Sequence, residues 1–432
     1  MQWNTGQQLR REKTLGTRPG SVCGRRSVMS GRIPEGWREC KLGDVAEIVG
    51  GGTPKTNVIE YWNGEIPWIT PRDLSNFNGR FISKGERNIS EKGLINSSAR
   101  ILPKGTILLS TRAPVGYLAI AENQMTTNQG FRSLIPFKNT DNIFLFYLLK
   151  NNVEYLKSQA TGTTFGELSG SVLGSLIFPF PPLPEQHAIA SVIGSLDDKI
   201  DLLNRENQTL EQMAEAIFRQ WFIEEADEKW EEVPLSEVFD FKEGPGIRNW
   251  QYRDNGIPFI NIRLISNGEI DVSKANFVSE AEANAKYKHF YLQRKDMVVS
   301  TSGTLGKVAI IRNYHLPLLL NTSVIRFRPK DGINFSFMYG YLRSNEFYEC
   351  LIDSASGSVQ LNFGPIHLKQ IVMKIPPNEK LEYFRKVVDP IYEKFELNYN
   401  QIRTLEKLRD TLLPKLMSGE VRVKLTDSEV QK

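Results

Sequence analysis

The sequence predicts an α+β protein with two tandem α/β modules that are separated and joined by two long antiparallel coiled-coil helices. Three observations lead to this fold. Short motifs of the first half recur in the second half in the same order. Each copy contains short β-branched and aromatic runs between turn residues, which is typical of strands. Each copy then ends in a proline-rich stretch followed by a long heptad pattern, which is typical of a coiled coil.

The internal repeat sets the domain organisation. The two copies are offset by 193 residues at a matched tryptophan (230 − 37) and by 195 at a matched alanine (355 − 160). This period is far longer than that of a solenoid repeat, so each copy should be a domain with its own connector. The matched segments are Gly36–Leu42 with Lys229–Leu235, Ile66–Ile69 with Ile257–Ile260, Lys104–Thr111 with Lys295–Thr301, Gly116–Ile120 with Gly306–Ile310, Thr127–Arg132 with Asn321–Arg326, and Ala160–Thr163 with Ala355–Ser358.

Each module is expected to mix strands with short helices. The strand prediction comes from β-branched and aromatic runs that are bounded by Gly, Pro, Asn or Asp. The helix prediction comes from apolar residues at helical spacing. The expected strands are Thr106–Ser110, Leu118–Ala121, Met297–Ser300 and Val308–Ile311, and the expected helices are Asn142–Lys157 and Phe335–Ile352.

The connectors begin after Pro181–Pro184 and Ile375–Pro377, because proline ends a strand and is tolerated at a helix start. A helix of about 40 residues is about 60 Å long, too long for one small module to cover. We therefore expect the two helices to pair, although each stripe packing on its own module is the alternative. The apolar stripe of each helix contains one asparagine, which would fix the register of the paired helices. Arg409 interrupts the apolar stripe of the second helix. The predicted pairing residues are Ile193, Leu196, Ile200, Leu203, Asn207 and Leu210 in the first helix, and Val388, Ile391, Phe395, Asn398, Ile402 and Leu405 in the second.

These signals divide the chain into six segments. The first is a basic, polar extension without the apolar core of a signal peptide, and we expect it to be disordered. The alternative is that this extension is an arm that contacts phosphates. Translation from Met29 would remove most of the extension. The segments are the extension (1–30), the first module (31–182), the central helix (183–228), the second module (229–376), the C-terminal helix (377–418) and a tail (419–432).

Composition narrows the class of protein. The formal net charge of +4 weakly favours an anionic partner such as nucleic acid. Three cysteines far apart and four scattered histidines give neither a disulfide framework nor metal-ligand spacing, so a reducing cytoplasm is expected. No stretch approaches the roughly 20 apolar residues that span a bilayer, so no membrane association is predicted.

The motifs of common catalytic sites are missing. Gly303–Val308 is too short for a phosphate-binding loop and lacks its Ser or Thr. Phe241–Gly246 resembles a glycine-rich S-adenosylmethionine loop, but Pro245 would break the helix that should follow. Asp197-Asp198-Lys199 fits a nuclease acidic-x-Lys pattern, yet it lies on the central helix, where we expect a solvated face. The chain is therefore predicted to be non-catalytic and to hold no cofactor.

Several segments resemble one known family. They are Gly50–Pro54, Pro181–Gln186 and, most specifically, Leu408–Glu420, with the sequence LRDTLLPKLMSGE. Together with the repeat, they resemble the specificity subunits of type I restriction-modification enzymes. The resemblance covers nearly everything from Ile33 to Val423.

The resemblance implies a role in sequence choice. Each module would be a target recognition domain that reads half of a bipartite site in double-stranded DNA. The helices would set the spacer and dock two methyltransferase subunits, which bring S-adenosylmethionine and methylate adenine. A restriction subunit that translocates DNA with ATP and magnesium is a further partner in complete systems. The loops differ between the modules, so we expect an asymmetric target.

Candidate DNA contacts were chosen from predicted loops. Bases in the major groove are read by Arg on guanine and by Asn or Gln on adenine, whereas Lys and Arg on phosphates position the protein. The structural alternative for each is a surface charge or a turn stabiliser. The candidates are Arg72, Lys84, Arg87, Arg112, Asn128 and Gln129 in the first module, and Arg248, Arg253, Arg263, Lys274, Lys307 and Asn321 in the second.

Three rival functions remain open from the sequence. A stand-alone DNA-binding regulator would bind its site tightly without a methyltransferase. A fused nuclease or methyltransferase would catalyse its reaction as a purified chain, against the missing motifs. A structural coiled-coil adaptor would leave two folded modules without a purpose. A methyltransferase gene beside this one would separate them.

Overall fold

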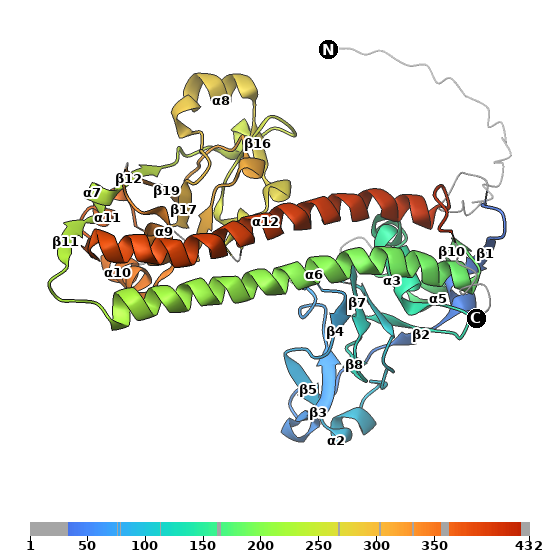
Figure 1. Cartoon of the computed structure of the whole chain (residues 1–432). Helices are drawn as coiled ribbons and strands as arrows, with labels where there is room; N and C mark the ends of the chain where they lie inside the picture. The colour runs from blue at the N-terminus through green and yellow to red at the C-terminus, as the bar shows by residue number, and fades with distance from the viewer. Residues whose placement is uncertain are drawn as a thin grey trace, which may run out of the picture. The chain divides into compact units, whose positions relative to one another are not determined.

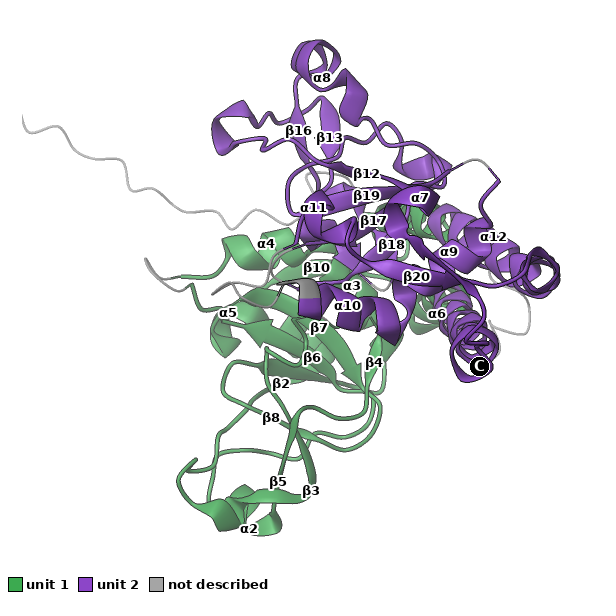
Figure 2. Cartoon of the chain, turned by 90° about the vertical axis from the view of Figure 1, so that its left-hand side faces the viewer, with its two compact units in different colours: residues 1–199, 405–432 green, residues 200–404 purple. Residues whose placement is uncertain are grey.

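The computed structural model describes residues 33–424 apart from 76, 78, 113, 162–165, 267, 302–303, 331 and 356–362. The predicted N-terminal extension and the last eight residues of the predicted tail (425–432) lie outside the described residues. The chain forms two compact units: residues 1–199 with 405–432, and residues 200–404 (Figure 2). Each unit holds one module and a segment of each long helix.

The main sheet of the first unit has five strands in the order β2-β9-β6-β7-β4, all antiparallel except the β4–β7 pair. Side chains of a strand alternate between its faces. Accordingly, Ile107 and Leu109 of β6 lie in the core beside the helices, whereas Leu108 lies in the core on the opposite face. Both faces are thus buried. The strands are β2 (Ala46–Gly50), β4 (Phe81–Ile82), β6 (Ile107–Thr111), β7 (Val115–Ala121) and β9 (Arg132–Pro136).

A smaller sheet of the first unit has the order β5-β3-β8. Its core contains Trp62 and Trp68, whose rings meet edge to face with centroids 5.0 Å apart, and Ile89. This sheet therefore has a hydrophobic core separate from that of the main sheet. Its elements are η1 (Ile59–Tyr61), β3 (Trp62–Ile69), β5 (Arg87–Ile89), α2 (Glu91–Ile95) and β8 (Thr126–Thr127).

Unit 2 repeats the main sheet in the order β12-β19-β17-β18. Two further two-stranded sheets pair β13 with β16 and β14 with β15. The same strand order in both modules confirms the tandem α/β fold class that the repeat predicted. The strands are β12 (Phe239–Glu243), β13 (Ile257–Phe259), β14 (Ile265–Ser266), β15 (Glu269–Ile270), β16 (Asn276–Val278), β17 (Met297–Ser300), β18 (Val308–Ile310) and β19 (Val324–Pro329).

Each module is closed by pairing its first strand with its last. β1 (Arg38–Lys41) pairs antiparallel with β10 (Ile177–Phe180), and β11 (Glu231–Pro234) pairs in the same way with β20 (Val372–Ile375). The remaining short helices are α1 (Leu42–Val45), α3 (Asn142–Asn151), α4 (Val153–Ser158), α5 (Gly170–Ser175), η2 (Gln220–Glu224), α7 (Leu235–Val238), η3 (Asn249–Gln251), η4 (Ile262–Leu264), η5 (Val272–Lys274), α8 (Glu280–Lys286), η6 (Lys288–Phe290), η7 (Asn313–His315), α9 (Phe335–Arg343), α10 (Asn345–Ala355) and α11 (Pro365–Leu368).

The two helices predicted inside the modules are each broken in two. Asn152 separates α3 from α4, and its side-chain Nδ2 donates to the Leu148 carbonyl at 2.7 Å. Ser344 separates α9 from α10, and its Oγ accepts from the Phe347 amide at 3.2 Å as an N-cap. Asn and Ser compete with the helical hydrogen bonds in this way, so apolar spacing alone gave helices that were too long.

Two long helices dominate the picture of the chain, α6 (Leu183–Arg219) and α12 (Asn378–Met417) (Figure 1). At 1.5 Å per residue they are about 55 and 60 Å long. In the first unit, Ile189 and Ile193 share a core with Leu413 and Leu416 and with the module itself. Each apolar stripe therefore packs both on the other helix and on a module, so the two alternatives raised by the sequence hold together.

Candidate DNA interface and helix surfaces

Four loops of the first module are held together by backbone hydrogen bonds. The Asn128 amide donates to Ile69 at 2.9 Å, the Gly52 amide to Thr127 at 2.9 Å, and the Thr111 amide to Gly130 at 2.8 Å. The loops after β2, β3, β6 and β8 therefore meet at one edge of the module. Loops held on a rigid frame are where binding residues concentrate.

A glycine makes this close approach possible in both modules. A Cβ on Gly51 would lie 2.0 Å from the Asn128 oxygen, and a Cβ on Gly244 would lie 2.2 Å from the Asn321 carbonyl carbon. Both pairs are related by the same offset of 193 residues (244 − 51 and 321 − 128). The second module lacks the Gly-Gly-Thr-Pro sequence but keeps the one glycine that this contact requires.

The candidate side chains of the first module lie around these loops. Arg72 is exposed and 3.9 Å from Glu86, and Lys84 is exposed. The Arg87 guanidinium lies over the Trp62 ring at 3.6 Å from its centroid, which holds the cation at the surface.

The side chains of the other three candidates in this module differ in how far other residues already engage them. Arg112 lies 3.8 Å from Glu167. Asn128 uses its Oδ1 to accept from the Gly130 amide at 2.9 Å and so stabilises the turn. Gln129 is exposed and accepts a hydrogen bond from the Thr53 hydroxyl. Of these three, Gln129 has the most exposed side chain for base contact.

The second module presents Arg248, Arg253, Arg263 and Lys274 as exposed side chains. Lys307 is half-buried, and its Nζ donates to the Ile265 carbonyl at 3.1 Å.

Asn321 corrects the sequence analysis. It is 4% exposed, and its Oδ1 accepts from the Ile247 amide at 3.0 Å. A buried side chain whose acceptor is already bonded cannot reach a base edge. Asn321 is therefore a structural residue of the module.

Asp197, the first residue of the acidic-x-Lys segment of α6, is a second correction because it is buried, whereas Asp198 and Lys199 are exposed as expected. Asp197 is 7% exposed. Its carboxylate accepts from the Tyr147 hydroxyl at 2.5 Å and from Arg409 Nη1 at 2.8 Å, and Arg80 Nη1 donates to Tyr147 at 3.1 Å. Although burial alone would raise the pKa of Asp197, the hydrogen bonds from Arg409 and Tyr147 hold it below its usual value. Arg409 thus interrupts the apolar stripe in order to pair with Asp197, and the segment has a structural role.

A second buried charge cluster anchors the second module. Glu269 pairs with Arg312 at 2.7 Å and with His315 Nε2 at 2.5 Å, and it accepts from the Tyr314 hydroxyl at 3.0 Å. Burial opposes ionisation of Glu269, but His315 and Arg312 hold its pKa below the usual value. The Arg403 guanidinium of α12 lies over the Tyr314 ring at 4.2 Å. No sequence spacing pointed to this cluster, because its members are brought together only by the fold.

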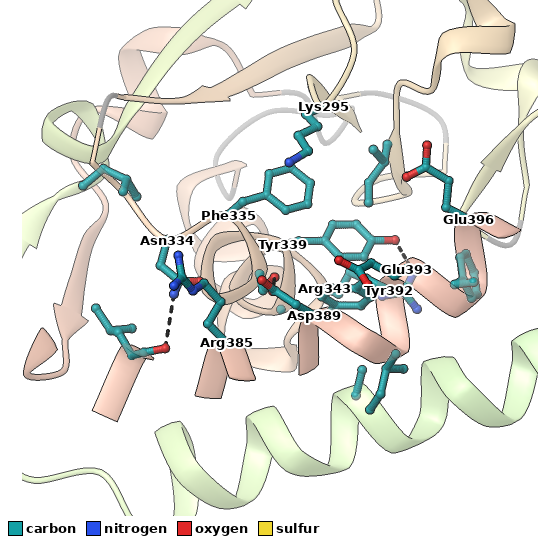
Figure 3. Close-up of a pocket in the computed structure, with 18 of the residues that line it drawn as sticks. Lys295, Asn334, Phe335, Tyr339, Arg343, Arg385, Asp389, Tyr392, Glu393 and Glu396 are labelled. Atoms are coloured by element: carbon teal, nitrogen blue, oxygen red, sulfur yellow. Dashed lines mark hydrogen bonds between the residues drawn. The ribbon is translucent and has the colours of Figure 1, made fainter. Parts of the chain in front are cut away.

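A cavity of ≈ 740 Å³ lies in unit 2 among α9, α6 and α12 (Figure 3). The rings of Phe335 and Tyr339 stack on successive turns of α9, with centroids 6.3 Å apart. Arg343 at the end of α9 pairs with Glu211 of α6 at 2.6 Å, and burial raises the pKa of Glu211. The cavity is lined by oppositely charged groups that join the second module to both helices.

The predicted pairing residues are all buried or half-buried. In unit 2, Asn398 Nδ2 donates to Asn207 Oδ1 at 2.9 Å, and Trp221 stacks on Tyr383 with ring centroids 5.1 Å apart. Between these two contacts the residue number rises from 207 to 221 on one segment and falls from 398 to 383 on the other, so the two segments run antiparallel. The buried residues are Ile193, Ile200, Leu203, Asn207, Val388, Phe395, Asn398 and Ile402, and the half-buried ones are Leu196, Leu210, Ile391 and Leu405.

Comparison with known proteins identifies the family. The family model of the type I restriction modification DNA specificity domain matches residues 34–212 and 227–407. The chain belongs to this family. The MjaIX type I restriction enzyme specificity subunit of Methanocaldococcus jannaschii is 37% identical over 418 residues, which cover 91% of this chain and 95% of that protein. The MjaVIII specificity subunit of the same organism is 25% identical over 413 residues, again covering 91% and 95%.

The shared fold extends to a solved structure. The crystal structure of the S subunit of a type I restriction-modification system from M. genitalium has a TM-score of 0.53 at 19% identity, covering 92% of this chain and 98% of that one. The resemblance seen in the sequence is therefore confirmed. Specificity subunits are the non-catalytic members of type I restriction-modification enzymes, which agrees with the motifs missing from this chain.

Outside the modules, this specificity subunit carries a repeated outer face on its long helices, which the heptad analysis missed. Leu202 and Met213 of α6 are 11 residues apart, which places them about 20° apart around the helix. At an offset of 195 residues they correspond to Leu397 and Leu408 of α12 (397 − 202 and 408 − 213). All four are between 45% and 65% exposed. A comparison of apolar residues outside the heptad stripe at the offset of 195 could have revealed these four residues in the sequence.

Two features of membrane and metal-binding proteins are absent from the described residues. None of the described helices is long and apolar enough to cross a membrane. Within the same residues, no group of three or more His, Cys, Asp or Glu side chains is placed to hold a metal ion.

Proposed function

We propose that each module of this specificity subunit reads one half of a bipartite, asymmetric site in double-stranded DNA, and that α6 and α12 set the spacer between the halves. The observation that carries this proposal is a repeated frame with unequal loops. The Gly51–Asn128 contact recurs as Gly244–Asn321, whereas the exposed side chains around it differ. A common frame supports the same mode of docking, and different loop residues support different half-sites.

The exposed candidates divide by chemistry. Gln129 can bond an adenine edge with its amide, and an arginine such as Arg72 or Arg248 can bond guanine with two parallel donors. Lys84 and Lys274 suit phosphates, which position the protein without specifying sequence. Arg87, held over the Trp62 ring, is preorganised for either contact because its position is fixed before DNA arrives.

We further propose that the repeated outer faces each bind one copy of a methyltransferase subunit. Leu202 and Met213 on one helix and their counterparts Leu397 and Leu408 on the other give two similar pairs of exposed apolar side chains, each pair on one face of its helix. Thr209 and Thr404 lie at matching positions between them (404 − 209 = 195) and make the same bond to the carbonyl four residues earlier. Two copies of one partner fit two copies of one surface.

The cofactors belong to the partners in this proposal. S-adenosylmethionine would enter with the methyltransferase subunits, and ATP and magnesium with a restriction subunit that joins the complete enzyme. The chain itself then supplies DNA sequence choice and geometry.

The test is to express the chain with the methyltransferase encoded beside it and to map methylated adenines across the host genome. We expect one bipartite motif with two different halves and a fixed spacer, and a complex with two methyltransferase copies by native mass spectrometry. An uninterrupted palindrome, or methylation that persists without this chain, would contradict the proposal.

A further inference from the structure

Trp250 is an exposed indole on the second module. It lies in the short turn η3, and 71% of its surface is open to solvent. The other tryptophans of the described residues are buried or half-buried. The hydrogen bond that the structure gives to this residue is made by its carbonyl oxygen, which accepts from Arg253 Nη1 at 3.2 Å. The ring itself is free to meet a ligand.

The turn that carries this ring is rigid. Gln251 is 3% exposed, and its Nε2 donates to Glu282 at 2.8 Å and to the Tyr287 hydroxyl at 2.7 Å. Its Oε1 accepts from the Arg248 amide at 2.9 Å. The buried Gln251 side chain therefore fixes the turn that presents the indole to solvent. Such preorganisation lowers the conformational entropy that is lost when a ligand binds.

Two arginines lie within three residues of Trp250 in the chain. Arg248 and Arg253 are both exposed, and Arg253 is held by the carbonyls of Trp250 and Tyr252 at 3.2 and 2.8 Å. An exposed aromatic ring on a turn with two exposed arginines suits a ligand that combines a flat ring with negative charge. Nucleic acid has this combination, because phosphates pair with arginine and a base can stack on an aromatic side chain where the protein unstacks it from the duplex.

The first module has an exposed apolar side chain at the corresponding position. The matched segments starting at Ile66 and Ile257 are offset by 191 residues, and this offset relates position 59 to position 250. Ile59 begins the equivalent turn η1 and is 83% exposed. Both modules thus present a large apolar group from the same turn, but only the second presents a π face.

We propose that Trp250 is a nucleobase-stacking site of the second module. It stacks on one base of the half-site that this module reads, at a step where that base is unstacked from the duplex, while Arg248 and Arg253 bind phosphates. Ile59 makes only van der Waals contact in the other half-site, so stacking makes the two halves unequal. This inference rests on the proposed DNA-reading function and adds the residue and its mode of contact.

The test measures binding of the complex of this chain with its methyltransferase to duplexes that carry the mapped site. Base stacking on an aromatic side chain corresponds to a loss of about 5- to 150-fold in affinity on truncation to alanine. We expect Trp250→Ala to weaken binding within this range and Trp250→Phe to retain part of it. Ile366→Ala is the matched control, because Ile366 is 74% exposed in the same unit and should change nothing.

A scan of abasic positions locates the stacked base. In the wild type, one abasic position in a single half-site should weaken binding by a similar factor, and Trp250→Ala should be insensitive to it. Unchanged affinity in Trp250→Ala, or loss of methyltransferase binding without loss of DNA affinity, would overturn the inference. A wild-type complex that binds no specific site would instead refute the proposed function itself.

Discussion

The buried asparagine pair of the long helices makes a prediction about register that can be worked from its hydrogen bonds. Asn398 is 1% exposed, and its Nδ2 donates to Asn207 Oδ1 at 2.9 Å and to Glu206 at 3.0 Å. Asn207 is 3% exposed, and its own Nδ2 has no partner among the described residues. The perturbation is replacement of either asparagine, or both, by leucine.

The order of stability follows from what each change leaves unpaired. Asn398→Leu leaves both polar groups of the Asn207 amide buried without a partner, at a cost of about 1–3 kcal/mol. Asn207→Leu removes that unpaired donor and leaves Asn398 bonded to Glu206, so it should be the milder change. The double variant leaves no buried amide in the seam. We therefore expect it to be about 1–3 kcal/mol more stable than the sum of the single effects.

The first assay is unfolding of the four proteins by heat and by urea. For a unit of about 200 residues, 1 kcal/mol corresponds to about 2–4 °C in the unfolding midpoint. Lys394→Ala is the control, because it removes only an exposed pair with Glu206 and should cost less than about 1 kcal/mol.

The second assay is the methylated motif. A buried asparagine fixes register at a cost in stability. The double variant should therefore methylate sites with more than one spacer length. Single effects that add within about 0.5 kcal/mol, together with an unchanged spacer in the double variant, would refute the register role.

Four other predictions test separate parts of the molecule. Asp197→Asn should flatten the pH dependence of stability: the lowered pKa of Asp197 means that it stabilises the fold above about pH 3.9 and that this stability is lost as the pH falls through the folded value, which urea unfolding between about pH 2.5 and 7 can measure. Gly340→Ala should destabilise despite the gain of about 1 kcal/mol in helix propensity, because its Cβ would lie 2.4 Å from Phe218 Cδ2; a higher unfolding midpoint would contradict the packing. Insertion of seven residues in both α6 and α12 adds about 10 Å and should lengthen the methylated spacer by about 3 base pairs without changing the half-sites. Arg112→Ala should weaken binding by about 1–3 kcal/mol if it contacts a base, and unchanged affinity with an unchanged motif would remove it from the interface.

The sequence was a good guide wherever contacts repeat along the chain. The heptad stripe found Asn207 and Asn398, because residues that face a partner helix recur at a fixed period. The motifs that repeat at a nearly constant offset likewise predicted two tandem α/β modules. These features depend on spacing, and spacing is visible without a structure.

The sequence failed where a contact joins distant segments through polar groups. Asp197 was expected in solvent because its neighbours are charged, but it is bonded by residues from distant segments, Tyr147 of the module and Arg409 of α12. Asn321 was expected at a base, although its role is set by the close approach of Gly244. The period of the apolar residues reveals which face of a helix or strand is buried. It does not reveal which charged side chain will be buried beside a partner from a distant segment.

These polar contacts also distinguish two modules that share a frame. Ser110 and Ser300 accept from the amides of Tyr117 and Lys307, both at 2.8 Å, so the turn after each central strand is locked in the same way. The anchors to the helices are not shared. At the offset of 195, Asp197 corresponds to Tyr392, which packs against Tyr339 with ring centroids 5.3 Å apart.

A module moved to the other position would therefore meet the wrong partners. Tyr147 would face an aromatic ring instead of the carboxylate of Asp197, and its buried hydroxyl would lose that acceptor. Leaving a buried donor without its partner costs about 1–3 kcal/mol, whereas loop changes at the surface usually stay within about 0.5 kcal/mol. Each module is thus tied to its own helix segments, while its exposed loops can change at little cost in stability. New DNA specificity can arise in the loops without disturbing the geometry that separates the two half-sites.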